Sequence, residues 1–155
     1  MGQNWSNSTD QTVNPGESIV FSTTVSPVQN GNVFHRDNTG EFLLSGGPRR
    51  NSCCCCSRNN NTKEVLTYFG ANIAIPEGGT VGAISVAIAV DGATVPFTTM
   101  TETPAAVNEF SNVSRVATIP IFRGCCQSVT IRNMSNQPMT VNNPNFGIPE
   151  NGGIR

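Results

Sequence analysis

Charge is what this sequence has least of. Only 12% of its 155 residues are charged, Lys63 is the only lysine, and the formal net charge is −1. In globular proteins, about a quarter of all residues are usually charged. So few basic residues cannot neutralise a phosphate backbone, and we therefore expect no nucleic-acid partner. A surface with little charge is also poorly protected against association, which indicates that much of it meets other copies of the chain.

Long apolar runs are absent as well. No stretch of about eighteen apolar residues occurs, so we expect no transmembrane span and no membrane partner. Residues 1–10 are polar and lack the basic and apolar regions of a secretory signal peptide. Cysteines made in a reducing cytosol would stay as thiols, and they would oxidise only after release from the cell, by lysis for instance.

Residues that commonly carry catalysis are scarce. His35 is the only histidine, and the sequence holds neither a nucleophile-elbow motif nor a phosphate-binding glycine loop. Its few carboxylates include no close pair that resembles a glycosidase or metal-hydrolase site. We interpret His35 as a surface or turn-bonding residue, with a catalytic role as the alternative. The sequence therefore predicts a protein that is not an enzyme, with no catalytic residue and no cofactor.

Helical periodicity is missing, and strand patterns take its place. Glycine and proline interrupt the chain at short intervals, and β-branched residues dominate between them. This pattern is typical of an antiparallel sandwich or barrel, so we expect one all-β domain of about eight strands. The expected strands are residues 18–25, 41–45, 64–75, 80–90, 95–100, 109–122, 128–133 and 139–142. A helical turn is expected at 104–107.

The clearest alternation occupies residues 80–90. Its large side chains form one face that fits a sandwich core, namely Ile84, Val86, Ile88 and Val90. Its small side chains form the other face, which we call the small-residue face: Ala83, Ser85, Ala87 and Ala89. Because this face is flat and nearly uncharged, we expect another layer or another subunit to pack closely against it.

Six cysteines fall in two runs and nowhere else. One run lies in a long irregular insert, residues 46–62, and the runs consist of Cys53, Cys54, Cys55, Cys56, Cys125 and Cys126. Neighbouring side chains of an extended segment point to opposite faces, so consecutive cysteines suit cross-links in more than one direction. We predict disulfides between the two runs or between subunits. A structural zinc site at Cys53, Cys56, Cys125 and Cys126, and free thiols, are the open alternatives.

The only tryptophan, Trp5, lies in a polar N-terminal segment, residues 1–14. This segment shows no apolar periodicity for packing into its own domain. Because tryptophan is enriched at interface hot spots, we predict that the segment is an arm that docks onto a larger assembly through Trp5. Packing of Trp5 inside its own domain is the alternative. The folded domain is expected at 15–148, followed by a C-terminal tail at 149–155.

Several stretches resemble a known family. They include a turn with His35-Arg36-Asp37, the motif Gly40-Glu41-Phe42-Leu43-Leu44, and residues 68–82, 84–92, 103–107 and 123–126. Together they resemble a group of proteins from Firmicutes and from their phages and prophages. That group is similar to the tumour-necrosis-factor-like, or complement-type, jelly-roll family. The resemblance covers residues 14–148.

The resemblance implies an antiparallel jelly-roll sandwich that forms a compact homotrimer with a structural or adhesive role. It implies a non-enzymatic virion structural protein on the virion surface: a trimeric capsid-decoration or head-fibre protein of a bacteriophage, with the capsid as partner. One alternative is a structural protein of the same fold on the bacterial cell or spore surface. Another is a carbohydrate-binding module with host-surface glycans as partners, although one Trp and one Tyr supply little aromatic surface for sugars.

Overall fold

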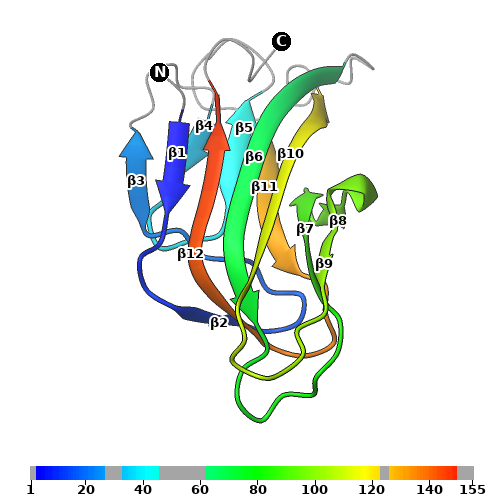
Figure 1. The fold of residues 1–155 in the computed structure, drawn as a ribbon. Coiled ribbons are helices and arrows are strands. Elements are labelled where there is room, and N and C mark those ends of the chain that lie inside the picture. Colours follow the sequence, from blue (N-terminus) through cyan, green and yellow to red (C-terminus); the bar gives the residue numbers. More distant parts are fainter. Residues whose placement is uncertain (1–2, 27–32, 46–61, 123–125, 150–155) are drawn as a thin grey trace.

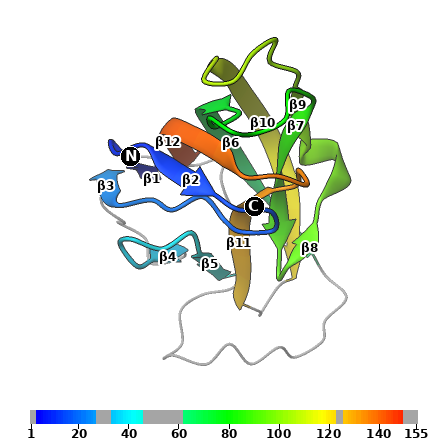
Figure 2. The ribbon, with the colours of Figure 1, turned by 90° about the horizontal axis from the view of Figure 1, so that it is seen from below.

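Two antiparallel β-sheets pack face to face in this protein (Figure 1). A computed structural model describes residues 3–26, 33–45, 62–122 and 126–149. The first sheet has the strand order β10-β6-β12-β1-β3, with β2 also beside β12. The second has the order β4-β5-β11-β7-β8, with β9 also beside β7. Figure 2 shows β1 and β12 in one layer and β4 and β5 in the other.

The strand bounds are as follows. The first sheet is built from β1 (Gln3–Ser6), β2 (Gln11–Val13), β3 (Thr23–Ser26), β6 (Thr62–Ala74), β10 (Ser111–Phe122) and β12 (Met139–Ile148). The second is built from β4 (Val33–His35), β5 (Phe42–Ser45), β7 (Ile84–Val90), β8 (Ala93–Thr94), β9 (Met100–Glu102) and β11 (Cys126–Asn133). Strands far apart in sequence are neighbours in both sheets, as in a jelly roll. The predicted all-β antiparallel sandwich is confirmed.

Alternating side chains build the core between the sheets. Ile84, Val86 and Ile88 of β7 are fully buried, as their spacing predicts, and Phe69 and Ile73 of β6 meet the core from the opposite sheet. Burying one such side chain contributes about 1.5–3 kcal/mol relative to leaving it in water. The part of the chain that the structure describes holds no helix with the length and hydropathy of a membrane span.

The segment expected as a strand at 95–100 leaves the sheet instead. Pro96 has no N–H for a strand ladder, and it begins a short 3-10 helix, η1 (Pro96–Thr98). Thr98 is buried, and its Oγ1 accepts a hydrogen bond from Ile88 N at 2.9 Å and donates one to Val95 O at 2.6 Å. The chain re-enters the sheet as β9. Residues 104–107 lie in bends and a turn rather than in the expected helical turn.

Strand β12 continues well beyond residue 142, where the sequence pattern predicts its end. The register between β12 and β6 shifts between Asn142 and Asn145, and Asn143 has a φ of 46°. This bulge accommodates Pro144, which cannot donate to the ladder. The strand then resumes and places Phe146 in the core.

The polar N-terminal segment belongs to the sandwich. β1 pairs with β12 and β3, and β2 pairs with β12. Polar side chains replace missing strand contacts here: the Gln11 amide donates to Val20 O at 2.9 Å and accepts from Val20 N at 2.8 Å. The described part of residues 1–14 is therefore packed into the domain that the sequence pattern predicts to begin at residue 15. The predicted strand at 18–25 is regular only from Thr23 onward.

Candidate functional site

Trp5 lies in the core rather than on an exposed arm. Its side chain is 1% exposed, and its ring contacts Phe42 edge-on at 4.8 Å between centroids and stacks near Phe146 at 6.2 Å. β1 holds it there by pairing on both edges. Packing inside its own domain, the alternative left open by the sequence, is what the structure shows. A side chain buried in this way is not available as a docking anchor.

His35 joins the same aromatic cluster and holds two chain segments together. Its ring stacks on Phe42 with centroids 4.3 Å apart. Nδ1 lies 2.9 Å from Glu41 O, and Nε2 lies 3.1 Å from Phe21 O. Each ring nitrogen faces a backbone carbonyl oxygen, and a neutral imidazole donates to only one of the two. This arrangement matches the turn-bonding interpretation of His35.

Most of the cysteines lie outside the described residues. This holds for Cys53, Cys54, Cys55, Cys56 and Cys125, so the disulfide, zinc and free-thiol alternatives all stay open. Cys126 begins β11, where its backbone pairs with Ser45. Within the described ranges, no group of three His, Cys, Asp or Glu side chains is placed to hold a metal ion.

The small-residue face is covered within the chain at two of its four positions, whereas Ala83 is exposed and Ser85 is half-buried. Ala87 and Ala89 are both fully buried. In the sheet, Ala87 lies opposite Arg132 and Ala89 lies between Thr130 and Thr94, whose larger side chains flank the alanines. η1 also packs on β7. At Ala87 and Ala89 the expected second layer thus comes from the same chain. These two residues therefore give no support to a subunit contact on this face.

An uncharged surface does remain open on the outside of the first sheet. It consists of outward-facing residues of β6, β10 and β12, which we call the neutral face: Leu66, Tyr68, Ser114, Val116, Thr118 and Gly147. Val116 is 69% exposed and lies opposite Tyr68 in the register. The Tyr68 ring lies against Gly147 so closely that a Cβ there would overlap it. Val116 and Tyr68 therefore lie side by side across two strands, and the Tyr68 ring covers Gly147, which is buried.

A row of side-chain amides borders the neutral face. Asn112 Nδ2 donates to Asn72 Oδ1 at 3.1 Å, and Asn72 Nδ2 donates to Asn142 Oδ1 at 3.3 Å. Asn142 in turn donates to the Asp10 carboxylate. These bonds tie the outer side chains of β10, β6 and β12 into a fixed array. At the other end of the face, Glu64 is exposed and charged.

The sequence carried a signal for this surface that composition alone does not show. In the strand at 109–122, the outward positions are polar at Asn112, Ser114 and Thr118, and Val116 interrupts them. An isolated valine in a polar register costs solubility without adding to the core. The sequence alone does not show that Val116 points outward. The pairing of β10 with β6 shows it.

Comparisons with known proteins identify the fold. No protein-family model and no curated protein sequence matches the chain. Among solved structures, the globular domain of zebrafish complement 1qA protein is similar, with a TM-score of 0.54, 10% identity and coverage of 94% of each chain. A family 35 carbohydrate-binding module from Clostridium thermocellum has a TM-score of 0.36 and 9% identity, covering 90% of this chain and 98% of that one.

A third solved structure is the Podospora anserina GH26-CBM35 β-(1,4)-mannanase, with a TM-score of 0.35 and 11% identity over 92% of this chain and 28% of that one. At scores this low, neither module supports an argument about ligands here. The likeness to the complement domain concerns the fold alone. With the strand order of the two sheets, it shows that the chain is an antiparallel jelly roll, similar in fold to that complement domain.

Proposed function

We propose that the protein is a non-enzymatic structural subunit that assembles into a homotrimer through the neutral face of its first sheet. Val116 carries the proposal, because it is 69% exposed beside Tyr68 on a face without charge. Val116 lies opposite Tyr68 and diagonal to Leu66, and a contiguous exposed apolar patch marks an interaction site. When this face meets a different surface of the next subunit, the contacts close into a ring. Three subunits are the number that the family resemblance implies.

A charged substitution at Val116 tests the interface. Val116→Asp places a carboxylate in the subunit contact, so the variant should be a folded monomer where the wild type is a trimer. Val81→Asp is the matched control, because Val81 is 50% exposed in a loop away from the neutral face. Size-exclusion chromatography with light scattering reports the masses. A Val116→Asp protein that stays trimeric at the lowest measurable concentration overturns this interface.

The proposed trimer serves a bacteriophage virion, where it decorates the capsid or forms a head fibre. The resemblance of residues 68–82 and 84–92 to phage and prophage proteins supports this role. A bacterial cell-surface or spore-coat protein is the second candidate, because the resemblance also includes proteins of Firmicutes themselves. Peptide mass spectrometry of density-purified particles and of spore-coat fractions separates the two. Absence of the protein from purified particles contradicts the virion role.

Attachment through residues 1–14 stays part of the proposal, although Trp5 is buried. Ser8, Thr9 and Asp10 are exposed between β1 and β2, so a partner can reach them. Deleting the segment would remove β1 from the core, and a point substitution is therefore the sharper test. Ser8→Arg should lower particle occupancy while the trimer and its melting temperature persist. Thr101→Arg, on exposed β9, is the control, and full occupancy of Ser8→Arg particles contradicts attachment at this loop.

A cross-link between the two cysteine runs is also part of the proposal. Ser45, which precedes the insert, pairs with Cys126, and Thr62, the last residue of the insert, pairs with Phe122. Both ends of the insert are therefore anchored beside the second run. Closing a loop of about seventy residues would stabilise the fold by about 4 kcal/mol.

Peptide mapping without reductant should find peptides that join the two runs. Metal analysis of the same sample detects zinc, which would make the site a thiolate centre instead. If all six cysteines alkylate without reductant and no metal is present, the cross-link is contradicted.

A further inference from the structure

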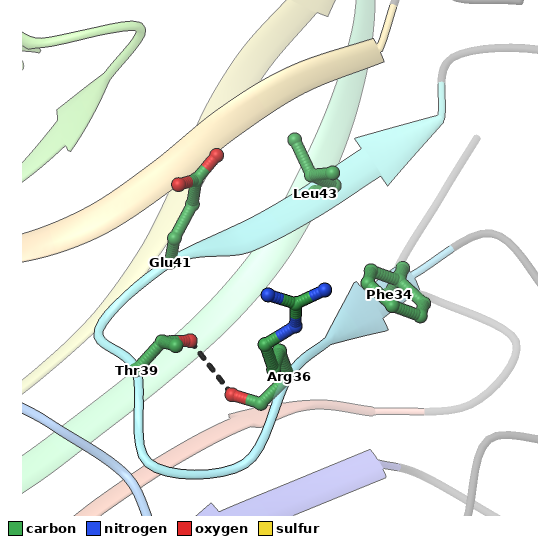
Figure 3. Close-up of a pocket in the computed structure, with 5 residues that line it drawn as sticks. All are labelled: Phe34, Arg36, Thr39, Glu41 and Leu43. Atoms are coloured by element: carbon green, nitrogen blue, oxygen red, sulfur yellow. Dashed lines mark hydrogen bonds between the residues drawn. The ribbon is translucent and has the colours of Figure 1, made fainter.

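A pocket of about 250 Å³ opens on the outer face of the β4–β5 hairpin (Figure 3). It is lined by Phe34, Arg36, Thr39, Glu41 and Leu43. The hairpin forms the edge of the second sheet, so the pocket lies on the opposite side of the sandwich from the neutral face. Pockets for drug-sized ligands begin at about 300 Å³, so this one fits a smaller group.

The backbone beneath the pocket is held rigidly. Along each strand, the pocket residues alternate with core residues: Val33 and Phe42 are buried on the inner face. His35 bonds to Glu41 O from below, and Thr39 Oγ1 donates to Arg36 O at 2.7 Å across the turn. The lining side chains are therefore presented by a fixed scaffold, which limits the ordering cost of binding a ligand.

Two of the lining side chains are large and apolar. Phe34 is 54% exposed and lies directly opposite Leu43 in the β4–β5 register. An exposed aromatic ring beside a second large apolar side chain loses unfavourable contact with water when a flat apolar group covers it. A ligand with one apolar face satisfies this requirement.

Two further lining side chains carry opposite charges. Figure 3 shows Arg36 and Glu41 projecting from the same face of the hairpin as Phe34. Within the described part of the chain, the charged atoms of these two side chains make no hydrogen bond and no ion pair. Arg36 offers only donors, and Glu41 offers only acceptors when ionised. A ligand that satisfies both must supply acceptors and donors within a short span.

Charge decides which ligand class fits. An anion would meet the Glu41 carboxylate, a cation would meet the Arg36 guanidinium, and a purely apolar ligand would desolvate both charges without compensation. A neutral sugar ring avoids all three penalties, because every hydroxyl both donates and accepts and the ring has an apolar C–H face. We propose that this pocket binds one ring of a neutral glycan. Phe34 stacks on the C–H face, Arg36 donates to sugar oxygens, and Glu41 accepts from hydroxyls.

Saturation-transfer NMR tests the proposal on the wild-type protein. The probes are neutral oligosaccharides, which are first selected on an array of neutral and sialylated glycans. They are then added at millimolar concentration, at which the NMR experiment detects weak binding. A neutral glycan should bind, and Phe34→Ala and Glu41→Gln should each weaken its affinity about tenfold or more. Phe97→Ala is the matched control, since Phe97 is 58% exposed on η1, and it should bind like the wild type.

Other outcomes overturn the proposal. The proposal fails if no neutral glycan binds at millimolar concentration, or if Phe34→Ala binds the glycan as tightly as the wild type. It also fails if the protein prefers sialylated probes and Glu41→Gln strengthens that preference. Displacement of the bound probe by a short peptide rather than by a sugar overturns it as well. The substituted side chains are exposed at the surface, so unchanged melting temperatures confirm folded variants. The site does not depend on trimer formation, so Val116→Asp should retain affinity for a soluble oligosaccharide.

Discussion

Asn133 shows how one buried polar residue ties distant parts of the chain together. It is 1% exposed, and its Nδ2 donates to Val13 O and to Gln137 O, both at 2.9 Å, while its Oδ1 accepts from Ser135 N at 2.8 Å. Both N–H groups of the amide and its oxygen are thus hydrogen-bonded. The bonds connect β2, the end of β11 and the loop that leads to β12.

Replacing Asn133 with alanine should therefore cost much stability. Asn133→Ala leaves two carbonyl oxygens and one N–H without their partner, and we expect a loss of about 2–4 kcal/mol in the free energy of unfolding. Asn136→Ala, at an exposed position of the same loop, should change it by less than about 0.5 kcal/mol. Denaturant titration measures both. Similar values for the two variants would contradict the structural role of Asn133.

Trp5 makes a second prediction at the residue scale. Because it packs against Phe42 and Phe146, Trp5→Ala should lower the free energy of unfolding by about 3–5 kcal/mol. Trp5 is the only tryptophan, so its fluorescence should be blue-shifted in the folded protein and red-shifted on unfolding. A red-shifted native spectrum, or a Trp5→Ala protein of wild-type stability, would mean that the side chain is exposed after all.

Among the elements, four long strands were predictable, whereas three short strands and the second half of β12 were not. β6, β7, β10 and β11 follow local alternation, which the sequence displays directly. β1, β2 and β4 are three or four residues long, and pairing with strands far along the chain creates them. Local pattern carries no information about such partners. The burial of Trp5 was missed for the same reason, since its polar neighbours hide a strand that exists only beside β12.

The candidate surfaces illustrate the same limit. An outward face of small residues was visible at 80–90, but whether it stays uncovered depends on η1 and on the side chains of neighbouring strands. The pocket residues Arg36 and Glu41 stand on either side of a turn, where their convergence depends on the β4–β5 register. Alternation in the sequence predicts which face of the sheet a side chain lies on. Tertiary packing decides what covers that face.

Strand β12 supplies a prediction at the element scale. Asn143 has a φ of 46°, in the left-handed region that asparagine tolerates and β-branched residues resist. Asn143→Val should lower the free energy of unfolding by about 1–2 kcal/mol, whereas Asn143→Gly should leave it nearly unchanged. Paired thermal and denaturant unfolding checks this. Equal stability of the two variants would mean that the bulge does not hold Asn143 in that conformation.

For the whole molecule, the two outer faces of the sandwich have different tasks in this account. In the proposed trimer, the neutral face of the first sheet would join subunits, and the hairpin pocket of the second sheet would face away from that contact. A trimer built in this way would present three pockets on its outside. Binding of one multivalent glycan by several pockets would raise the apparent affinity without new contacts in any one of them.

The mass of the protein in solution tests the central claim most directly. Native mass spectrometry over a range of micromolar concentrations, with reductant present so that no disulfide contributes, measures the assembly held by the neutral face alone. The account predicts a dominant species of three times the 16.4 kDa chain mass. A dominant species at 16.4 kDa throughout that range, or a dimer, would contradict it.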